Sequence, residues 1–123
     1  MKLRFRNNSL RLRVNRREVD GLAAGAVLEE EVHFPGDARF AYVLDASRDG
    51  LPDASFGDGV IRISAPRSEV QEWAASDEIG IYFEMGSNGT PLRVAIEKDL
   101  ECVDEPREER DPHAFPRVLS KNC

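Results

Sequence analysis

Residues 1–14 read MKLRFRNNSLRLRV, and this stretch decides the fold because it has the pattern of a β-hairpin. Apolar and basic side chains alternate on either side of Asn7-Asn8-Ser9, a triplet whose residues tolerate a tight reversal. One face of the hairpin is therefore predicted to be apolar. The opposite face is predicted to carry five positive charges, from Lys2, Arg4, Arg6, Arg11 and Arg13.

Length and composition place the chain among ordinary globular proteins. Its 123 residues fit one domain, and 41% hydrophobic with 33% charged residues is a typical soluble composition. No apolar run approaches the ~18 residues that a membrane helix needs. Residues 1–14 also lack the apolar core of a signal peptide. Two cysteines argue against a disulfide framework, so we expect a cytoplasmic protein.

Helix and strand patterns follow the hairpin. Asn15 and Glu18 have the spacing of a capping box, and the apolar residues after them recur as on one face of a short helix. The later segments are assigned from alternation and turn residues. The predicted order is strands at 27–34 and 39–44, a loop over 45–58, a strand at 60–63, a helix from 66, and strands at 79–83 and 92–96.

The two halves of the chain match at a constant offset of 51 residues. When three extra residues are allowed in the second turn, Arg39 also meets Arg93. We interpret 1–45 and 53–102 as two copies of a ββαββ-like unit; the alternative is that short amphipathic segments resemble each other by chance. Seven identities support the repeat: Phe5/Phe56, Arg11/Arg62, Arg16/Arg67, Glu18/Glu69, Val19/Val70, Ala23/Ala74 and Ala24/Ala75.

These features predict a single β-rich α+β domain over residues 1–123. Two units would pack as a pseudo-twofold, partly closed β-barrel with two short helices, which would hide strand edges. The acidic, proline-containing tail 103–123 is predicted to be mobile, or to lie over the surface with Phe115 as its anchor. Burial of four aromatic side chains would contribute about 2–3 kcal/mol each: Phe5, Phe56, Trp73 and Phe83.

Charge is segregated along the chain. Residues 1–17 hold seven basic groups and no acid, whereas the rest of the chain holds ten basic and all 23 acidic groups. Like charges on neighbouring strands repel, so this asymmetry favours an anionic partner. The alternative is neutralisation by acids of the same or a neighbouring chain, such as Glu29, Glu31, Glu84 or the tail. The candidate anion- or nucleic-acid-binding residues are Lys2, Arg4, Arg6, Arg11, Arg13, Arg16 and Arg17.

Two resemblances rest on particular stretches. The run 8–13 (NSLRLR) leading to Glu18-Val19, with 97–102 (EKDLEC) near the end, resembles a family of small bacterial proteins of unknown function. That resemblance implies a cytosolic bacterial protein and transfers no activity. A more local similarity is to swapped-hairpin DNA-binding regulators and antitoxins, in which a basic hairpin lies on DNA and two copies intertwine. The second copy in this chain departs from that pattern, because Arg62 is its only hairpin base.

Two groups of residues have some of the ligands that a metal site needs. Asp45, Asp49, Gly50 and Asp53 fit several positions of a calcium loop, but Phe56 stands where a bidentate Glu is needed. Cys102, His113 and Cys123 offer three soft ligands at spacings that are not typical of zinc. We therefore predict no metal site and no cofactor.

Catalytic motifs are sparse. There is no Gly-rich phosphate loop and no Gly-x-Ser-x-Gly elbow, and His33 and His113 have no partner by spacing. An enzyme hypothesis requires a barrel that binds polyphosphate and metal through charged side chains that point inward. Alternation along the strands places several of these side chains outside. Those charges would be Arg11, Arg39, Arg62, Arg93, Glu84 and Glu97.

The function predicted from the sequence is therefore non-enzymatic. We expect a small binding module whose basic hairpin meets an anionic macromolecule, with nucleic acid as one possible partner, or an acidic protein surface. The alternatives are a polyphosphate- or nucleotide-handling barrel and a structural homodimer without a small ligand.

Overall fold

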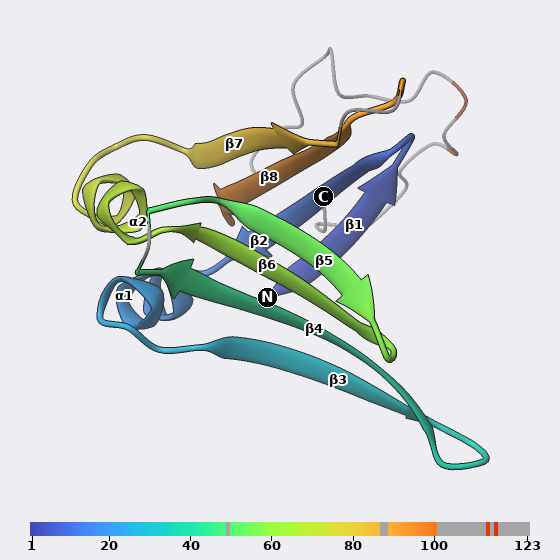
Figure 1. Ribbon diagram of the computed structural model, residues 1–123. Coiled ribbons are helices and arrows are strands. Elements are labelled where there is room, and N and C mark those ends of the chain that lie inside the picture. The colour runs from blue at the N-terminus through green and yellow to red at the C-terminus, as the bar shows by residue number, and fades with distance from the viewer. Residues whose placement is uncertain (49, 87–88, 101–112, 114, 116–123) are drawn as a thin grey trace.

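A computed structural model describes residues 1–48, 50–86, 89–100, 113 and 115 (Figure 1). Its described part is a strand-rich α+β structure with two helices and two four-stranded sheets. In chain order the elements are β1 (Lys2–Arg6), β2 (Ser9–Val14), α1 (Arg16–Ala23), β3 (Leu28–Phe34), β4 (Ala38–Ser47), β5 (Asp53–Gly57), β6 (Val60–Pro66), α2 (Arg67–Ala74), β7 (Gly80–Met85) and β8 (Leu92–Lys98).

Each sheet combines one hairpin from the first half of the chain with one from the second half. Sheet A has the order β1-β2-β8-β7, and sheet B has the order β3-β4-β6-β5. The hairpins are antiparallel, whereas the central pairs β2–β8 and β4–β6 are parallel. The helices carry the chain from one sheet to the other, so the two halves are interleaved (Figure 1).

Local features recur at the predicted offset. Lys2 pairs with Arg13 in the first hairpin, and Asp53 pairs with Ser64 at the same register in β5–β6. The two helices also span equivalent positions. Neither sheet closes on itself, so the partly closed barrel is not confirmed, and duplication of one unit stays a prediction.

The second half of the predicted repeat has a different register in the sheets. Ser9 pairs with Arg93 in sheet A, whereas Val60, its counterpart at the offset of 51, pairs with Ala41 in sheet B. The two parallel ladders therefore differ by two residues. Within the hairpins, however, Arg39 lies opposite His33 and Arg93 lies opposite Glu84, as the match requires, so the match of Arg39 with Arg93 stays a prediction. Sequence spacing cannot detect this shift, because ladder register depends on packing between distant segments.

A single apolar core joins both sheets and both helices. Asn15 begins α1 with the predicted capping box: its side chain accepts from the Glu18 amide, and Glu18 accepts from the Asn15 amide. Trp73 is fully buried on α2, and its indole Nε1 donates to the Ile79 carbonyl at 2.9 Å. The fully buried large side chains are Leu12, Val14, Leu22, Leu44, Ile63, Val70, Trp73, Val94 and Ile96.

Two of the aromatic residues predicted to be buried are exposed. Phe5 is 60% exposed and Phe56 is 71% exposed, whereas Trp73 is buried and Phe83 packs against the core while half-buried. The physical reason is that the sheets diverge away from the helices, so the β1–β2 and β5–β6 hairpins do not close over one another (Figure 1).

Two expectations about connecting segments also change. The predicted loop over 45–58 is shorter, because β4 runs to Ser47 and β5 begins at Asp53. Asp45 thus lies in a strand and not in a calcium loop. In the tail, Phe115 is 98% exposed, so it does not anchor the segment to the surface. Cys102 and Cys123 lie outside the described residues.

Candidate anion-binding surface

The five basic residues of the first hairpin lie on one surface, the outer face of sheet A. Leu10 and Leu12 are buried in the core, so alternation directs Arg11 and Arg13 away from it. Lys2 lies opposite Arg13, and Arg4 lies opposite Arg11. We call this surface the cationic face and define it by Lys2, Arg4, Arg6, Arg11 and Arg13.

Two of the five charges are compensated by acids of the same chain. Arg11 Nε lies 3.0 Å from Glu97 Oε1, and Glu97 also accepts a 2.7 Å hydrogen bond from the Tyr82 hydroxyl. Lys2 Nζ lies 2.9 Å from Asp99 Oδ2, in a pair that leaves the lysine side chain 73% exposed. Both acids come from the end of β8 or just beyond it. Internal neutralisation was therefore a correct expectation in part, but the acids are not the predicted ones.

Three guanidinium groups of the cationic face remain available. Within the part of the chain that the structure describes, the side chains of Arg4, Arg6 and Arg13 make no hydrogen bond or ion pair. Arg4 and Arg6 are exposed, and Arg13 is half-buried. An extended strand places alternate side chains about 7 Å apart, so β1 presents a regular row of cations.

The sequence did not identify one further cation on this surface. Arg93 lies in β8 directly beside Ser9 of β2, and its side chain is 74% exposed. Among the described residues, its one ion pair is a long contact of 3.8 Å with Glu84. Alternation within β8 places Arg93 and Glu97 on the same outer side as Arg11. The parallel β2–β8 pairing brings Arg93 to the hairpin, and no local pattern reveals that pairing.

The last two predicted residues lie apart from the cationic face. Arg16 and Arg17 form the exposed first turn of α1. Arg16 lines a separate hollow of about 570 Å³ at the helix end, where Asp20, Asp77 and Asp99 also contribute. Arg16 therefore shares this hollow with three acids, and the argument for anion binding rests on the strands.

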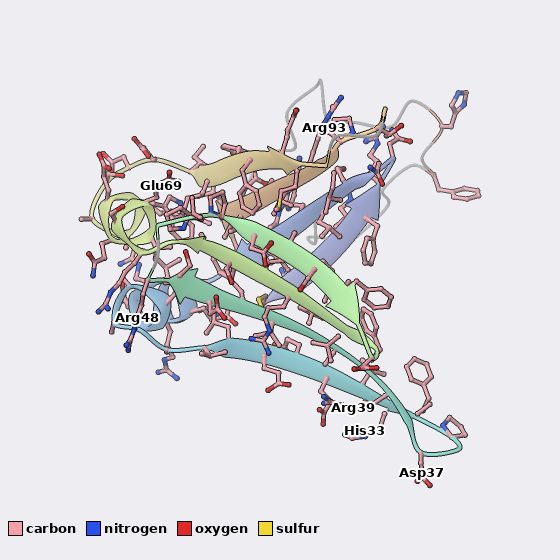
Figure 2. All side chains as sticks on the ribbon, viewed as in Figure 1. His33, Asp37, Arg39, Arg48, Glu69 and Arg93 are labelled. Atoms are coloured by element: carbon pink, nitrogen blue, oxygen red, sulfur yellow. The ribbon has the colours of Figure 1, made fainter. Side chains whose placement is uncertain are left out.

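The outer face of sheet B has a different character. Glu31 accepts from Arg39, and its carboxylate lies 2.6 Å from His33 Nε2. The contact with His33 contributes most to lowering the pKa of Glu31, and Arg39 adds to it. Figure 2 shows His33 and Arg39 beside the β3–β4 hairpin, at the opposite side of the molecule from Arg93. The two outer faces therefore point in opposite directions and carry different charge.

Ion pairs recur at related places in the two sheets. Arg62 NH1 lies 3.4 Å from Asp45 Oδ2, and Ser64 donates to the same carboxylate. Arg62 lies 51 residues after Arg11, and Asp45 occupies the place in sheet B that Glu97 occupies in sheet A. β2 and β6 thus each have one arginine that pairs with an acid of the same chain. The arginines of β1 are therefore the distinctive feature of sheet A.

An ion pair connects the start of β1 to α1. The Met1 ammonium lies 2.7 Å from Glu18 Oε2 and 3.6 Å from Glu30 Oε1. Burial raises the pKa of Glu18, but hydrogen bonds from the ammonium and from the Asn15 amide outweigh it, so the net pKa lies below the ordinary value. Burial, with Glu30 and Glu18 nearby, raises the pKa of Tyr42, whose hydroxyl donates to the Met1 carbonyl.

Within the described ranges, no three or more His, Cys, Asp or Glu side chains gather as a metal site would require. No described helix has the length and apolarity to cross a membrane. The six charges that would have lined a polyphosphate barrel all lie on the outer faces, on sheet A for Arg11, Glu84, Arg93 and Glu97 and on sheet B for Arg39 and Arg62.

Comparisons with known proteins give one match. Residues 1–118 match a family described as "Family of unknown function (DUF7009)". Neither the curated proteins nor the solved structures contain a significant match.

Proposed function

The chain belongs to this family of unknown function, so its geometry has to carry the functional argument, and we propose that it is a non-enzymatic binding module. Its cationic face binds the phosphate backbone of a nucleic acid. Arg4, Arg6 and Arg13 supply the contacts, and Arg93 extends the surface across β8. Guanidinium groups suit this role because their planar fork can donate two parallel hydrogen bonds to a phosphate.

The observation that carries the proposal is the pairing of like charges in the β1–β2 hairpin. Lys2 lies opposite Arg13, and Arg4 lies opposite Arg11. Directly opposed like charges in a hairpin are destabilising, by an amount on the order of 0.2–1 kcal/mol per pair. A face that only needed solvation would be satisfied by charges of mixed sign. Binding of a polyanion would remove this repulsion, which explains why the cationic face carries charges of one sign.

The cationic face is confined to one half of the interleaved structure. At the offset of 51, the positions of Lys2, Arg4 and Arg6 are occupied by Asp53, Ser55 and Gly57. If the two halves are copies of one unit, only the first copy has the basic β1-type strand. This supports a single nucleic-acid site per chain, in contrast to the two equivalent hairpins of an intertwined regulator.

The polyphosphate-barrel alternative finds no support in this arrangement. Its charged residues lie on opposite outer faces, and the space between the sheets is lined mainly by apolar side chains. A homodimer without a ligand would leave the opposed arginines unexplained.

The test is binding to mixed-sequence duplex DNA and RNA, measured by fluorescence anisotropy over a salt series. At ~50 mM salt, non-specific contacts to phosphates should be measurable. Replacing both Arg4 and Arg13 with Gln should weaken binding to every sequence alike and lower the salt slope by about 2, roughly one per phosphate contact.

The matched control replaces Arg48 and Arg67 with Gln. Both are exposed and lie away from β1 and β2, at the ends of β4 and β6, and their loss changes net charge by the same amount. The control should bind as the unmodified protein does. The proposal fails if the unmodified protein ignores both nucleic acids, or if the two double variants lose affinity equally.

A further inference from the structure

A cleft of about 730 Å³ opens between the ends of the two sheets. Its floor consists of the core residues Leu10, Ile61 and Ile63, which are at most 8% exposed. Phe5 from β1 and Phe56 from β5 also line it, together with Phe40 of β4. We call this space the apolar cleft. Its volume lies within the roughly 300–1,000 Å³ that small-molecule sites occupy.

The two exposed phenylalanines point to a purpose for the apolar cleft. Phe5 and Phe56 stand at equivalent positions of the β1–β2 and β5–β6 hairpins, and each remains more than half exposed. Exposed aromatic side chains that share one concave site are more typical of ligand contact than of stability. The cleft thus has a complete apolar floor and two rings whose surfaces are not covered by described residues.

The charge at one end of the apolar cleft selects the ligand. Of the described residues that line it, Arg6 alone is charged, and the polar turn residues Asn7, Asn8 and Ser9 lie beside it. None of the described lining residues is acidic, and the Arg6 guanidinium has no partner in the same part of the chain. A single positive charge at the end of an apolar space is complementary to an amphiphile with an anionic head group.

The polar end of the apolar cleft is held in place. The Asn8 amide donates to the carbonyl oxygens of Thr90 and Pro91, at 3.2 and 3.0 Å. Ser9 donates back to the Arg6 carbonyl. These hydrogen bonds tie the turn before β2 to the segment before β8, so Arg6 and Asn7 extend from a fixed support.

We propose that the apolar cleft binds a monocarboxylate with an aliphatic chain. The chain lies over Leu10, Ile61 and Ile63 between Phe5 and Phe56, and the carboxylate meets Arg6 and the β1–β2 turn. This site shares Arg6 with the cationic face, at the end of β1, but none of its apolar residues belongs to that face, because they face inward, between the sheets. The cleft volume of about 730 Å³ is that of a small-molecule site, so the occupant we infer is a small ligand.

The test uses dodecanoate and dodecanol as probes, with binding followed by calorimetry and native mass spectrometry. Dodecanoate should bind the full chain at concentrations below about 1 mM, which corresponds to roughly −4 kcal/mol. Phe56→Ala should weaken binding of both probes about tenfold through lost apolar contact. Phe34→Ala is the matched control: Phe34 is 53% exposed in β3 and does not line the cleft, so its loss should leave affinity unchanged.

A second substitution tests the polar end. Arg6→Gln should weaken dodecanoate about tenfold, as expected for a lost charged hydrogen bond, and leave dodecanol unchanged. The proposal is overturned if dodecanoate does not bind, or if Phe56→Ala and Phe34→Ala lose affinity equally. It is also overturned if sedimentation shows that the unmodified protein is a dimer and that Phe56→Ala converts it to a monomer. Phe5→Ala repeats the measurement from the other sheet, and both phenylalanine variants should still bind DNA.

Discussion

Replacing Arg4 with Glu should make the protein more stable while it loses its proposed activity. Arg4 lies directly opposite Arg11 in the β1–β2 ladder, and both side chains point away from the core. The substitution removes a like-charge pair and creates an attractive cross-strand pair in its place. Arg11 already has Glu97 on its other side at 3.0 Å, so a second acid would surround the guanidinium with partners.

The magnitude follows from the exposure of the site. Cross-strand pairs contribute roughly 0.2–1 kcal/mol each, and both changes act in the same direction, so a gain of about 1 kcal/mol is expected. For a chain of 123 residues this corresponds to a rise in Tm of about 4 °C. The gain should shrink in high salt, since exposed charges are screened over about 3 Å at 1 M salt.

The assay is urea unfolding followed by circular dichroism, with Arg48→Glu as the control. Arg48 is exposed, and no described residue pairs with it, so the control makes the same charge change away from the hairpin. If Arg4→Glu is no more stable than Arg48→Glu in low salt, the opposed arginines do not repel measurably. The cationic face would then need no polyanion to explain it.

Three further predictions concern the framework. Trp73→Phe should destabilise the fold by about 1–3 kcal/mol in urea titrations, because it leaves a cavity at a fully buried side chain and removes one of the two hydrogen bonds to the Ile79 carbonyl, which keeps the Lys98 amide as its other donor. Glu18→Gln should lower the free energy of unfolding by about 1 kcal/mol at neutral pH. Folding lowers the pKa of Glu18, so the stabilisation by its carboxylate is present above the unfolded pKa and is lost as pH falls through the folded pKa. Unfolding curves measured over a pH series would test this. Gly59→Ala should cost at least about 1–3 kcal/mol, because the residue has φ of 75° and a Cβ would lie 2.7 Å from the Arg39 carbonyl oxygen; unchanged thermal unfolding would contradict this.

The strands and helices were largely readable from local patterns. The first hairpin, the capping box at Asn15 and Glu18, and the apolar face of α1 all rest on interactions within a few residues of each other. Period-two alternation also placed the five hairpin cations on one side of the sheet. These features depend on backbone geometry that neighbouring residues impose, so a single sequence is enough to find them.

The partners of the cationic face could not be found in the same way. The acids that compensate Arg11 and Lys2 are Glu97 and Asp99, and they reach these residues only because β8 pairs in parallel with β2. The predicted acids Glu29 and Glu31 lie instead on sheet B, where Arg39 engages them. Which acid pairs with which base of the cationic face could therefore be decided only from the order of strands in the sheets.

The sequence by itself determined the alternating hairpin, the two capped or proline-started helices and the recurrence at 51 residues, because each follows from side-chain period and turn chemistry along a short stretch. Only the tertiary structure decided that hairpins from opposite halves share each sheet and that β8 supplies Glu97 and Arg93 to the cationic face. It also decided that Phe5 and Phe56 stay exposed in a cleft. Those outcomes depend on how distant strands pair and how far two packed sheets diverge, and both are set by the packing of the whole core.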